Sequence, residues 1–210
     1  MDLFNIINEL EARADTARAL DMSRYMKNRF PFFGIQAPIR DEICKPYFKD
    51  AKKEKKIDWD FVEYCWQHEK RECQYIAAHY LKSLQKFLEI TDFEKLKKLV
   101  IKKSWWDTVD ILDRIIGSLI YRDETLKKEI LKWSVDDNIW LRRVAIDHQL
   151  LRKEKTDTNL LEKILVNNLN HTEFFINKAI GWALIIEREY CLILLSKCFS
   201  FSYCLIVLYY

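Results

Sequence analysis

Apolar residues recur three and four positions apart in four separate runs of this chain. These runs are Phe61 to Trp66, Phe93 to Ile101, Leu126 to Trp133 and Leu160 to Leu169. Such spacing is typical of an amphipathic helix that buries one face. The chain has only 3 Gly and 3 Pro, and Pro46 is the last Pro, so most of it lacks the turn residues that hairpins need. The pattern predicts an all-α protein.

A second pattern repeats over a longer distance. Four segments align without gaps: Cys73 to Ala77, Trp106 to Asp110, Leu141 to Ala145 and Ile176 to Ile180. Their second residues, Gln74, Asp107, Arg142 and Asn177, are separated by 33, 35 and 35 positions. This period is typical of helix pairs stacked on their neighbours, as in HEAT, armadillo or tetratricopeptide arrays. We therefore predict an α-solenoid of HEAT-like or armadillo-like repeats, with each aligned segment in the second helix of its pair.

One position of the aligned segments breaks the pattern. The fifth residue is Ala77, Asp110, Ala145 and Ile180 in turn, so one carboxylate stands where the other repeats are small or apolar. These positions should line one continuous concave surface, where an unpaired charge is costly. An ion pair or a helix cap to a neighbouring repeat would explain an isolated Asp. Trp106, however, lies four residues before Asp110 and so on the same helix face.

The third position of the segments adds positive charge. It is occupied in turn by Tyr75, Thr108, Arg143 and Lys178. Trp182 closes the last segment. A carboxylate flanked by indoles and bordered by cations suits a cationic ligand that is attached to phosphates. Indole faces attract cations, and arginine binds phosphate through two hydrogen bonds.

The tryptophans have an alternative explanation as core aromatics. We expect that role for Trp105, Trp133 and Trp140. For Trp106 and Trp182 we expect a functional role, because they share the surface of Asp110.

Composition and charge limit the remaining classes. The net charge of +3 permits DNA binding without requiring it. The basic runs at residues 52–56 and 95–103 are more typical of solvated helix faces or loops than of binding patches. The six Cys form no CxxC motif and no Cys/His pair at zinc spacing, so we predict reduced, mostly buried thiols and no metal. The chain has no P-loop, GxGxxG or GxSxG motif, so no cofactor is expected.

Four motifs follow one another along the chain. They are residues 23–30 with Phe33 to Gln36 and Pro38, then Ser104 to Asp110, then Asp137 to Leu141 with Arg143, and finally Phe174 to Ile176 with Lys178 to Trp182. In this order they resemble the motifs of the AlkD-like family of DNA alkylation repair proteins. The resemblance covers about residues 1–184.

The resemblance implies a curved helical-repeat protein that holds duplex DNA on its concave face and hydrolyses the N-glycosidic bond of N3- and N7-alkylated purines. It implies that Asp110 is the catalytic carboxylate and that Trp106 and Trp182 are paired cleft aromatics. Arg143 matches the arginine that contacts the DNA backbone. We also expect Lys178 and Tyr25 to contact DNA.

The implied chemistry agrees with these residue types. Alkylation at N3 or N7 makes the purine a positively charged leaving group, so its departure needs no general acid. A fixed carboxylate at Asp110 can stabilise the oxocarbenium-like sugar and orient the attacking water. This mechanism predicts poor activity on neutral damage such as uracil. We expect a monomer. Because the acidic N-terminal segment is unlike a signal peptide, we expect the protein in the cytoplasm, and at the nucleoid if the source is bacterial.

The C-terminal segment departs from this pattern. From Tyr190 to Tyr210 it reads YCLILLSKCFSFSYCLIVLYY, in which Lys197 is the only charged residue. The segment is long enough for a membrane helix, although Lys197 and the scattered serines oppose insertion. A buried capping helix is a second interpretation, and a shifted reading frame or truncated gene product is the one we favour. We therefore predict one repeat domain at residues 1–189 and an atypical hydrophobic tail at residues 190–210.

A function from another class remains open. Most helical-repeat proteins are binding scaffolds, so a non-catalytic solenoid that binds DNA or a protein partner is the alternative. Asp110 discriminates between the two. An Asp110 held in an ion pair away from Trp106 and Trp182 would favour the scaffold.

Overall fold

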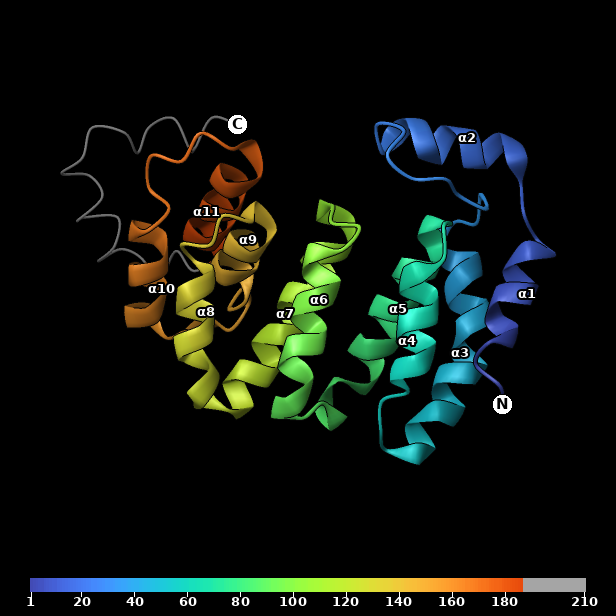
Figure 1. Cartoon of the computed structure of the whole chain (residues 1–210), viewed down its shortest axis with the longest axis horizontal. Coiled ribbons are helices and arrows are strands. Elements are labelled where there is room, and N and C mark those ends of the chain that lie inside the picture. The colour runs from blue at the N-terminus through green and yellow to red at the C-terminus, as the bar shows by residue number, and fades with distance from the viewer. Residues whose placement is uncertain (187–210) are drawn as a thin grey trace. The chain divides into compact units, whose positions relative to one another are not determined.

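The computed structural model describes residues 1–186, and within them it contains helices and connecting segments but no β-strand (Figure 1). This confirms the all-α class. The chain divides into two compact units, Met1–Leu88 and Glu89–Tyr210. The domain predicted for residues 1–189 contains the first unit and the described part of the second, and its last three residues lie outside the described part.

The helices of each unit follow one another with short connections. The first unit contains α1 (Asn5–Glu11), α2 (Thr16–Tyr25), α3 (Ala37–Glu54), α4 (Trp59–Gln67), α5 (Arg71–Leu84) and the 3₁₀ turn η1 (Gln85–Phe87). The second contains η2 (Ile90–Asp92), α6 (Phe93–Ile101), α7 (Trp106–Arg122), η3 (Glu124–Leu126), α8 (Lys127–Trp133), α9 (Ile139–Asp147), η4 (Lys153–Lys155), α10 (Thr158–Val166) and α11 (Phe174–Ile186).

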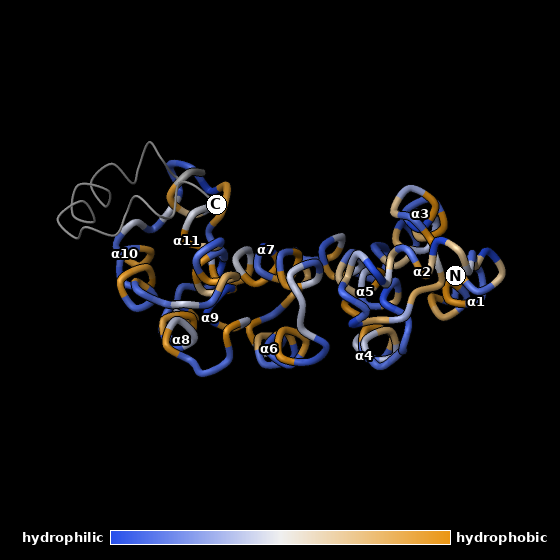
Figure 2. The backbone as a smooth tube through the Cα atoms, turned by 90° about the horizontal axis from the view of Figure 1, so that it is seen from above, coloured by the Kyte–Doolittle hydropathy of each residue, from blue (hydrophilic) through white to orange (hydrophobic). Residues whose placement is uncertain are grey.

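Both helices of each predicted pair are present, and three pairs pack directly, α4 with α5, α6 with α7 and α8 with α9, whereas α10 packs on α8 and α9. The amphipathic runs correspond to α4, α6, α8 and α10, except that Leu126 lies in η3 and the run predicted to Leu169 extends past the end of α10 at Val166. The aligned segments lie in α5, α7, α9 and α11. Figure 2 shows hydrophobic and hydrophilic residues alternating along α6 and α10, as expected for helices that bury one face. In the second unit α9 packs against both α7 and α11, so successive second helices are neighbours.

The polar second residue of the aligned segments has a structural explanation. In three repeats its side chain donates a hydrogen bond to the backbone carbonyl six residues earlier: Gln74 to His68 at 2.8 Å, Arg142 to Asp136 at 2.5 Å and Asn177 to His171 at 2.9 Å. Each bond satisfies a carbonyl in the connection between the two helices of a pair. The repeat is therefore visible in the sequence because the same connection is stabilised in three of the four repeats.

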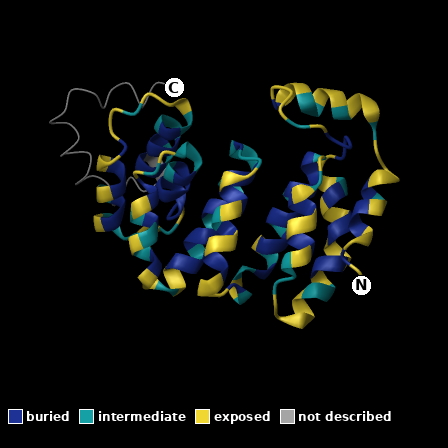
Figure 3. Cartoon of the chain, viewed as in Figure 1, coloured by how far each residue is buried: buried dark blue, intermediate teal, exposed yellow. Residues whose placement is uncertain are grey.

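A buried carboxylate holds the connection between α2 and α3 in place. Glu72 on α5 accepts hydrogen bonds from the backbone N–H groups of Phe33, Gly34 and Ile35 at 3.0, 2.9 and 3.0 Å. Gly34 has φ of +92°, and an added Cβ would lie 2.1 Å from the carbonyl oxygen of Asp15. Helix α2 itself buries no residue and is largely exposed in Figure 3, so this connection, rather than a core face, fixes it to the unit.

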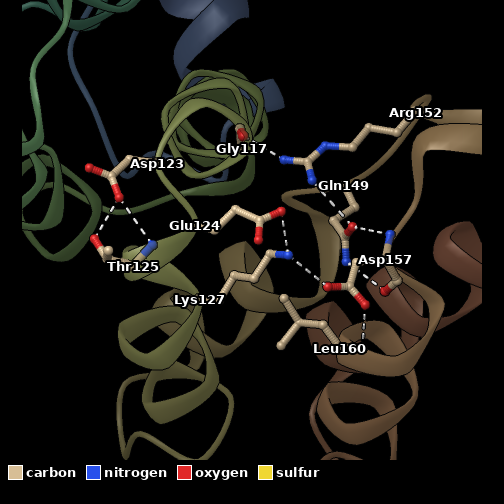
Figure 4. A network of polar contacts seen from close by, with 9 residues as sticks. All are labelled: Gly117, Asp123, Glu124, Thr125, Lys127, Gln149, Arg152, Asp157 and Leu160. Carbon is tan, nitrogen blue, oxygen red and sulfur yellow. Dashed lines mark hydrogen bonds and ion pairs between the residues drawn. The ribbon is translucent and has the colours of Figure 1, made fainter.

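The second unit has a close backbone contact of its own. An added Cβ at Gly117 on α7 would lie 1.8 Å from the carbonyl oxygen of His148. Arg152 bridges the same place, because its guanidinium donates to the carbonyl of Gly117 and to the side chain of Gln149 (Figure 4). Helix α7 can approach the residues after α9 this closely only because residue 117 has no side chain.

An ion-pair network joins the repeat that contains α8 to the repeat that contains α10. Lys127 lies between Glu124 and Asp157, with N–O distances of 2.8 and 3.0 Å (Figure 4). Asp157 also caps α10 by accepting from the backbone N–H of Leu160. These contacts orient α10 against α8, but the lysine and both acids are partly exposed, so we assign them a modest energy.

Three of the cysteines are described, and all of them, Cys44, Cys65 and Cys73, are buried and form no disulfide with one another. This confirms the prediction of buried thiols for the first unit. Within residues 1–186 no helix combines the length and hydropathy that a membrane crossing requires. The remaining cysteines and the tail at residues 190–210 lie outside the described residues.

We expect Gly117→Ala to destabilise the protein. Alanine is normally favoured over glycine in a helix by about 1 kcal/mol. Here its methyl group would overlap a backbone carbonyl that has no room to retreat, so we expect a net loss of roughly 1–3 kcal/mol in the free energy of unfolding. Urea denaturation measures this, and Ser118→Ala on the same helix should change stability by less than about 0.5 kcal/mol. An unchanged or increased stability of Gly117→Ala would contradict the packing described.

Candidate functional site

Asp110 and Arg143 form the centre of the candidate site. Asp110 lies in the second turn of α7, and Arg143 lies in the middle of α9. The guanidinium donates from Nε to Asp110 Oδ1 at 2.8 Å and from Nη2 to Oδ2 at 3.0 Å. The Arg143 side chain is 1% exposed and that of Asp110 is 19% exposed. One edge of a firmly held carboxylate therefore remains open to a ligand.

Arg143 also contacts α11, which follows α7 and α9 in the series of second helices of this unit. Its Nη1 donates to the backbone carbonyl of Phe175, at the start of α11, at 2.7 Å. Its Cζ lies 5.0 Å from the ring centroid of Trp182, also on α11. Burial opposes the charge on the guanidinium, but the hydrogen bonds to Asp110 and the charges of nearby carboxylates outweigh it and raise the pKa of Arg143.

Two further carboxylates lie beside this ion pair. Asp113 on α7 and Asp147 on α9 are 1% and 0% exposed. One oxygen from each of Asp110, Asp113 and Asp147 lies within 4.8 Å of the others. Burial raises the pKa of both buried carboxyls, and it raises that of Asp147 to about 7. The site therefore holds two more carboxyl groups than the ion pair between Asp110 and Arg143 requires.

The spacing of these three oxygens alone would suit a cation. Arg143, however, already lies against Asp110, and its Nη2 is 3.7 Å from Asp147 Oδ2. A divalent ion would be placed beside a buried guanidinium, where like charges repel strongly. We therefore interpret the cluster as an ion-pair network.

The two tryptophans predicted to be functional are partly exposed. Trp182 lies beside Arg143, and the Nζ of Lys178 is 5.9 Å from the Trp182 ring centroid. Trp106 is the first residue of α7, one helical turn before Asp110. The structure thus brings Asp110, Arg143, Lys178 and Trp182 together, with Trp106 on the same helix as Asp110.

The other tryptophans differ in their burial. Trp105 and Trp133 are 5% and 2% exposed, which confirms the core role predicted for them. Trp140 is only half-buried and packs against Trp105 and Phe175, so the prediction of a core position was wrong for this residue. Its indole forms the outer layer of an aromatic cluster rather than part of the interior.

Comparison with known proteins gives the family. The family model described as "DNA alkylation repair enzyme" matches residues 6–188. The chain belongs to the DNA alkylation repair enzyme family. It is also similar to a solved structure, a predicted DNA alkylation repair enzyme from Enterococcus faecalis, with 33% identity, 84% of each chain covered and a TM-score of 0.75. A search of curated proteins gives no match. Family membership indicates an enzyme that acts in the repair of alkylated DNA.

The last of the expected DNA contacts belongs to the other unit. Tyr25 ends α2 and is 75% exposed. Arg24 on the same helix is exposed as well, and Lys27 and Arg29 follow it. The expected contact at Tyr25 therefore lies beside exposed basic residues, of which Arg24 is ion-paired with Asp21 at 3.2 Å.

Sequence reasoning missed two residues of the cluster. Asp113 is three residues after Asp110, and Asp147 is four residues after Arg143, so each lies on the same helix face as a predicted site residue. That spacing was a usable signal. It could not show that the two faces meet, because contacts between α7 and α9 depend on how the repeats pack.

The raised pKa of Asp147 predicts a distinctive dependence of stability on pH. A carboxyl whose pKa is higher in the folded state binds its proton more tightly there. Its favourable contribution is complete below the ordinary value of 3.8 and is lost as the pH rises to about 7. Relative to Asp147→Asn, the parent protein should lose up to about 1.4 kcal/mol of unfolding free energy per pH unit across this window.

Urea unfolding of both proteins at several pH values measures this difference. Asp60→Asn, at an exposed position of α4, controls for the removal of one surface carboxylate. A difference between the parent and Asp147→Asn that stays constant with pH would show that Asp147 holds no additional proton in the folded state.

Proposed function

We propose that this protein is a DNA glycosylase that hydrolyses the N-glycosidic bond of cationic N3- or N7-alkylated purines in duplex DNA. The observation that carries the proposal is Asp110, a partly exposed carboxylate held by a buried arginine beside Trp182. Membership of the DNA alkylation repair family supports DNA as the substrate.

The arrangement suits a reaction that passes through a positive charge. Loss of an alkylated purine leaves an oxocarbenium-like sugar, and a preorganised carboxylate stabilises such a cation without having to reorient. Asp110 is fixed by two hydrogen bonds from Arg143, so its direction is set before the substrate binds. The same carboxylate can accept a hydrogen bond from the attacking water and so orient it.

The tryptophans suit the charge of the lesion. An indole face attracts a cation by roughly 0.5–2 kcal/mol, and a purine carrying an extra alkyl group is positively charged. We assign Trp106 and Trp182 to this role. A neutral base such as uracil would gain little from these rings and would also lack the protonating acid that it needs to leave.

The DNA backbone is assigned to Arg143, Lys178 and Tyr25. Lys178 is partly exposed beside Trp182, and Tyr25 is exposed on α2. Arg143 is buried, and its donors are directed at Asp110 and at the Phe175 carbonyl. Its contact with a phosphate therefore requires it to exchange one of these partners.

We also propose that residues 1–189 act on DNA as one domain and as a monomer. The 33-residue interval between Gln74 and Asp107 includes the boundary between the two compact units, so the sequence repeat is present in both.

The second candidate is a scaffold that binds DNA without cleaving it. Its supporting observation is that Asp110 is in an ion pair, which is a sufficient structural reason for a carboxylate at that position. The pair does not lie away from the aromatic residues, however, because Trp182 contacts the guanidinium. We therefore place the glycosylase first.

Asp110→Asn should abolish the excision of 7-methylguanine and 3-methyladenine from methylated duplex DNA. Removing the negative charge removes the stabilisation of the sugar cation, for which we expect a loss of about 10²-fold or more. DNA binding should be unchanged or stronger. Release of free bases, followed by chromatography with the purified full chain, is the measurement.

Asp107→Asn on the same helix is the matched control, and it should keep base release within a few-fold of the parent. Uracil-containing DNA should release no base at a comparable rate. Base release by Asp110→Asn at the parent rate would exclude the proposed mechanism. If neither the parent protein nor Asp110→Asn releases a base, although both samples are folded and bind DNA, the scaffold is favoured.

Lys178→Gln should weaken binding to duplex DNA and reduce its salt dependence. A lysine that contacts one phosphate releases about one counterion, so the slope of log K against log salt should fall by about 0.9. Fluorescence anisotropy at several salt concentrations measures the slope. Lys163→Gln, at an exposed position of α10, should leave it closer to that of the parent, and an unchanged slope for Lys178→Gln would remove Lys178 from the DNA contacts.

A further inference from the structure

Two buried carboxyl groups, Asp113 and Asp147, each place an oxygen within 4.8 Å of the other beside the candidate site, without enough hydrogen bonds to stay charged. They come from neighbouring helices, α7 and α9, each about one turn after a residue of the central ion pair. Neither oxygen of Asp147 accepts a hydrogen bond from any described residue, and Oδ1 of Asp113 accepts none. Two carboxylates at such range in a low-dielectric interior cannot both remain ionised at small cost.

The number of charged groups around the two carboxyls also indicates that one of them is protonated. Within the described residues, the charged groups acting on Asp147 are Arg143 on its own helix and Asp110 and Arg114 on α7. Asp147 in turn raises the pKa of Asp113. Arg114 lies 3.4 Å from Asp113, and its side chain is 36% exposed. His148 follows Asp147 and adds no charge, because burial lowers its pKa to about 3. Three carboxylates thus face two guanidinium groups, and one proton restores neutrality.

Arg143 has two possible carboxylate partners, Asp110 and Asp147. It is hydrogen-bonded to Asp110 at 2.8 and 3.0 Å, while Nη2 lies 3.7 Å from Asp147. A shift of less than 1 Å would complete a hydrogen bond to Asp147, whose normal length is about 2.7–2.9 Å for such a pair. The charge on Asp147 decides whether that shift is favourable.

We propose that Asp113 and Asp147 share one buried proton, and that this proton sets the position of the Arg143 guanidinium between Asp110 and Asp147. Asp147 is thus a positioning residue. With the proton bound, Arg143 stays on Asp110 and neutralises it. When the proton leaves to water, anionic Asp147 draws Arg143 away, and Asp110 presents more of its negative charge. The catalytic consequence rests on the proposed glycosylase function, but the proton-sharing pair does not.

Binding of a cationic ligand and a rise in pH should both favour ionisation of the pair formed by Asp113 and Asp147. A positive charge beside Asp110 favours ionisation of the nearby acid pair, so binding of a cationic lesion would help to release the proton and free Asp110. The pKa of Asp147, raised to about 7 by burial, places this change close to neutral pH. The pair would couple the charge of the ligand to the charge of the site.

The direct test is the ¹⁵N NMR signal of Arg143 Nε in the full chain, assigned with Arg143→Lys, across a pH titration through neutrality. In the parent it should move with a midpoint near 7. In Asp147→Asn that midpoint should be lost, and in Asp113→Asn it should shift to lower pH because a like charge has been removed. Asp60→Asn, exposed on α4, should leave it unchanged. A flat signal in the parent, or the same midpoint in Asp147→Asn, overturns the proposal.

Base release under single-turnover conditions over the same pH range separates this inference from the proposed function. Release by the parent should rise through the NMR midpoint, and the rise should be lost in Asp147→Asn. A titrating Arg143 signal without base release at any pH supports the proton-sharing pair and removes the glycosylase. Base release with the same pH dependence in Asp147→Asn keeps the glycosylase and overturns the positioning role of Asp147.

Discussion

A buried guanidinium must find all of its acceptors inside the protein, and this requirement organises the second unit. Arg143 is 1% exposed, and it satisfies its donors with the Asp110 carboxylate on α7 and the Phe175 carbonyl on α11. One side chain on α9 therefore ties together three consecutive second helices. Removal of Asp110 would leave the buried charge of Arg143 unpaired. The relative placement of these helices and the direction of Asp110 are therefore determined together.

The same logic extends through the repeat. Side chains of one repeat satisfy polar groups of another about one period away, as Asn168 does for the Ser134 carbonyl and Arg152 for that of Gly117. A helix pair cannot cover its own apolar face, so each pair depends on its neighbours for packing, and these bonds define the register in which the pairs stack. The first unit uses a different device, since Glu72 binds three backbone N–H groups of one connection.

The chemistry of the candidate site follows from its position at the edge of this packing. Asp110 is held from the buried side and open on the other, which is the geometry required of a group that stabilises a passing positive charge. Trp182 and Lys178 adjoin it because they lie on α11, one repeat further along the chain. The excess of carboxylates beside it makes the state of one proton relevant to the charge that Asp110 presents.

The sequence alone determined the helix pairs, their period and the position of Asp110 as an exception among apolar equivalents. These features are local, since they depend on which residues recur at helical spacing and at the repeat interval. Only the tertiary structure decided that Arg143 is buried against Asp110, that Asp113 and Asp147 meet, and that Trp140 stays partly outside the core. Each of these depends on which faces of α7, α9 and α11 meet, and that is set by the packing of whole repeats, which no spacing within one helix specifies.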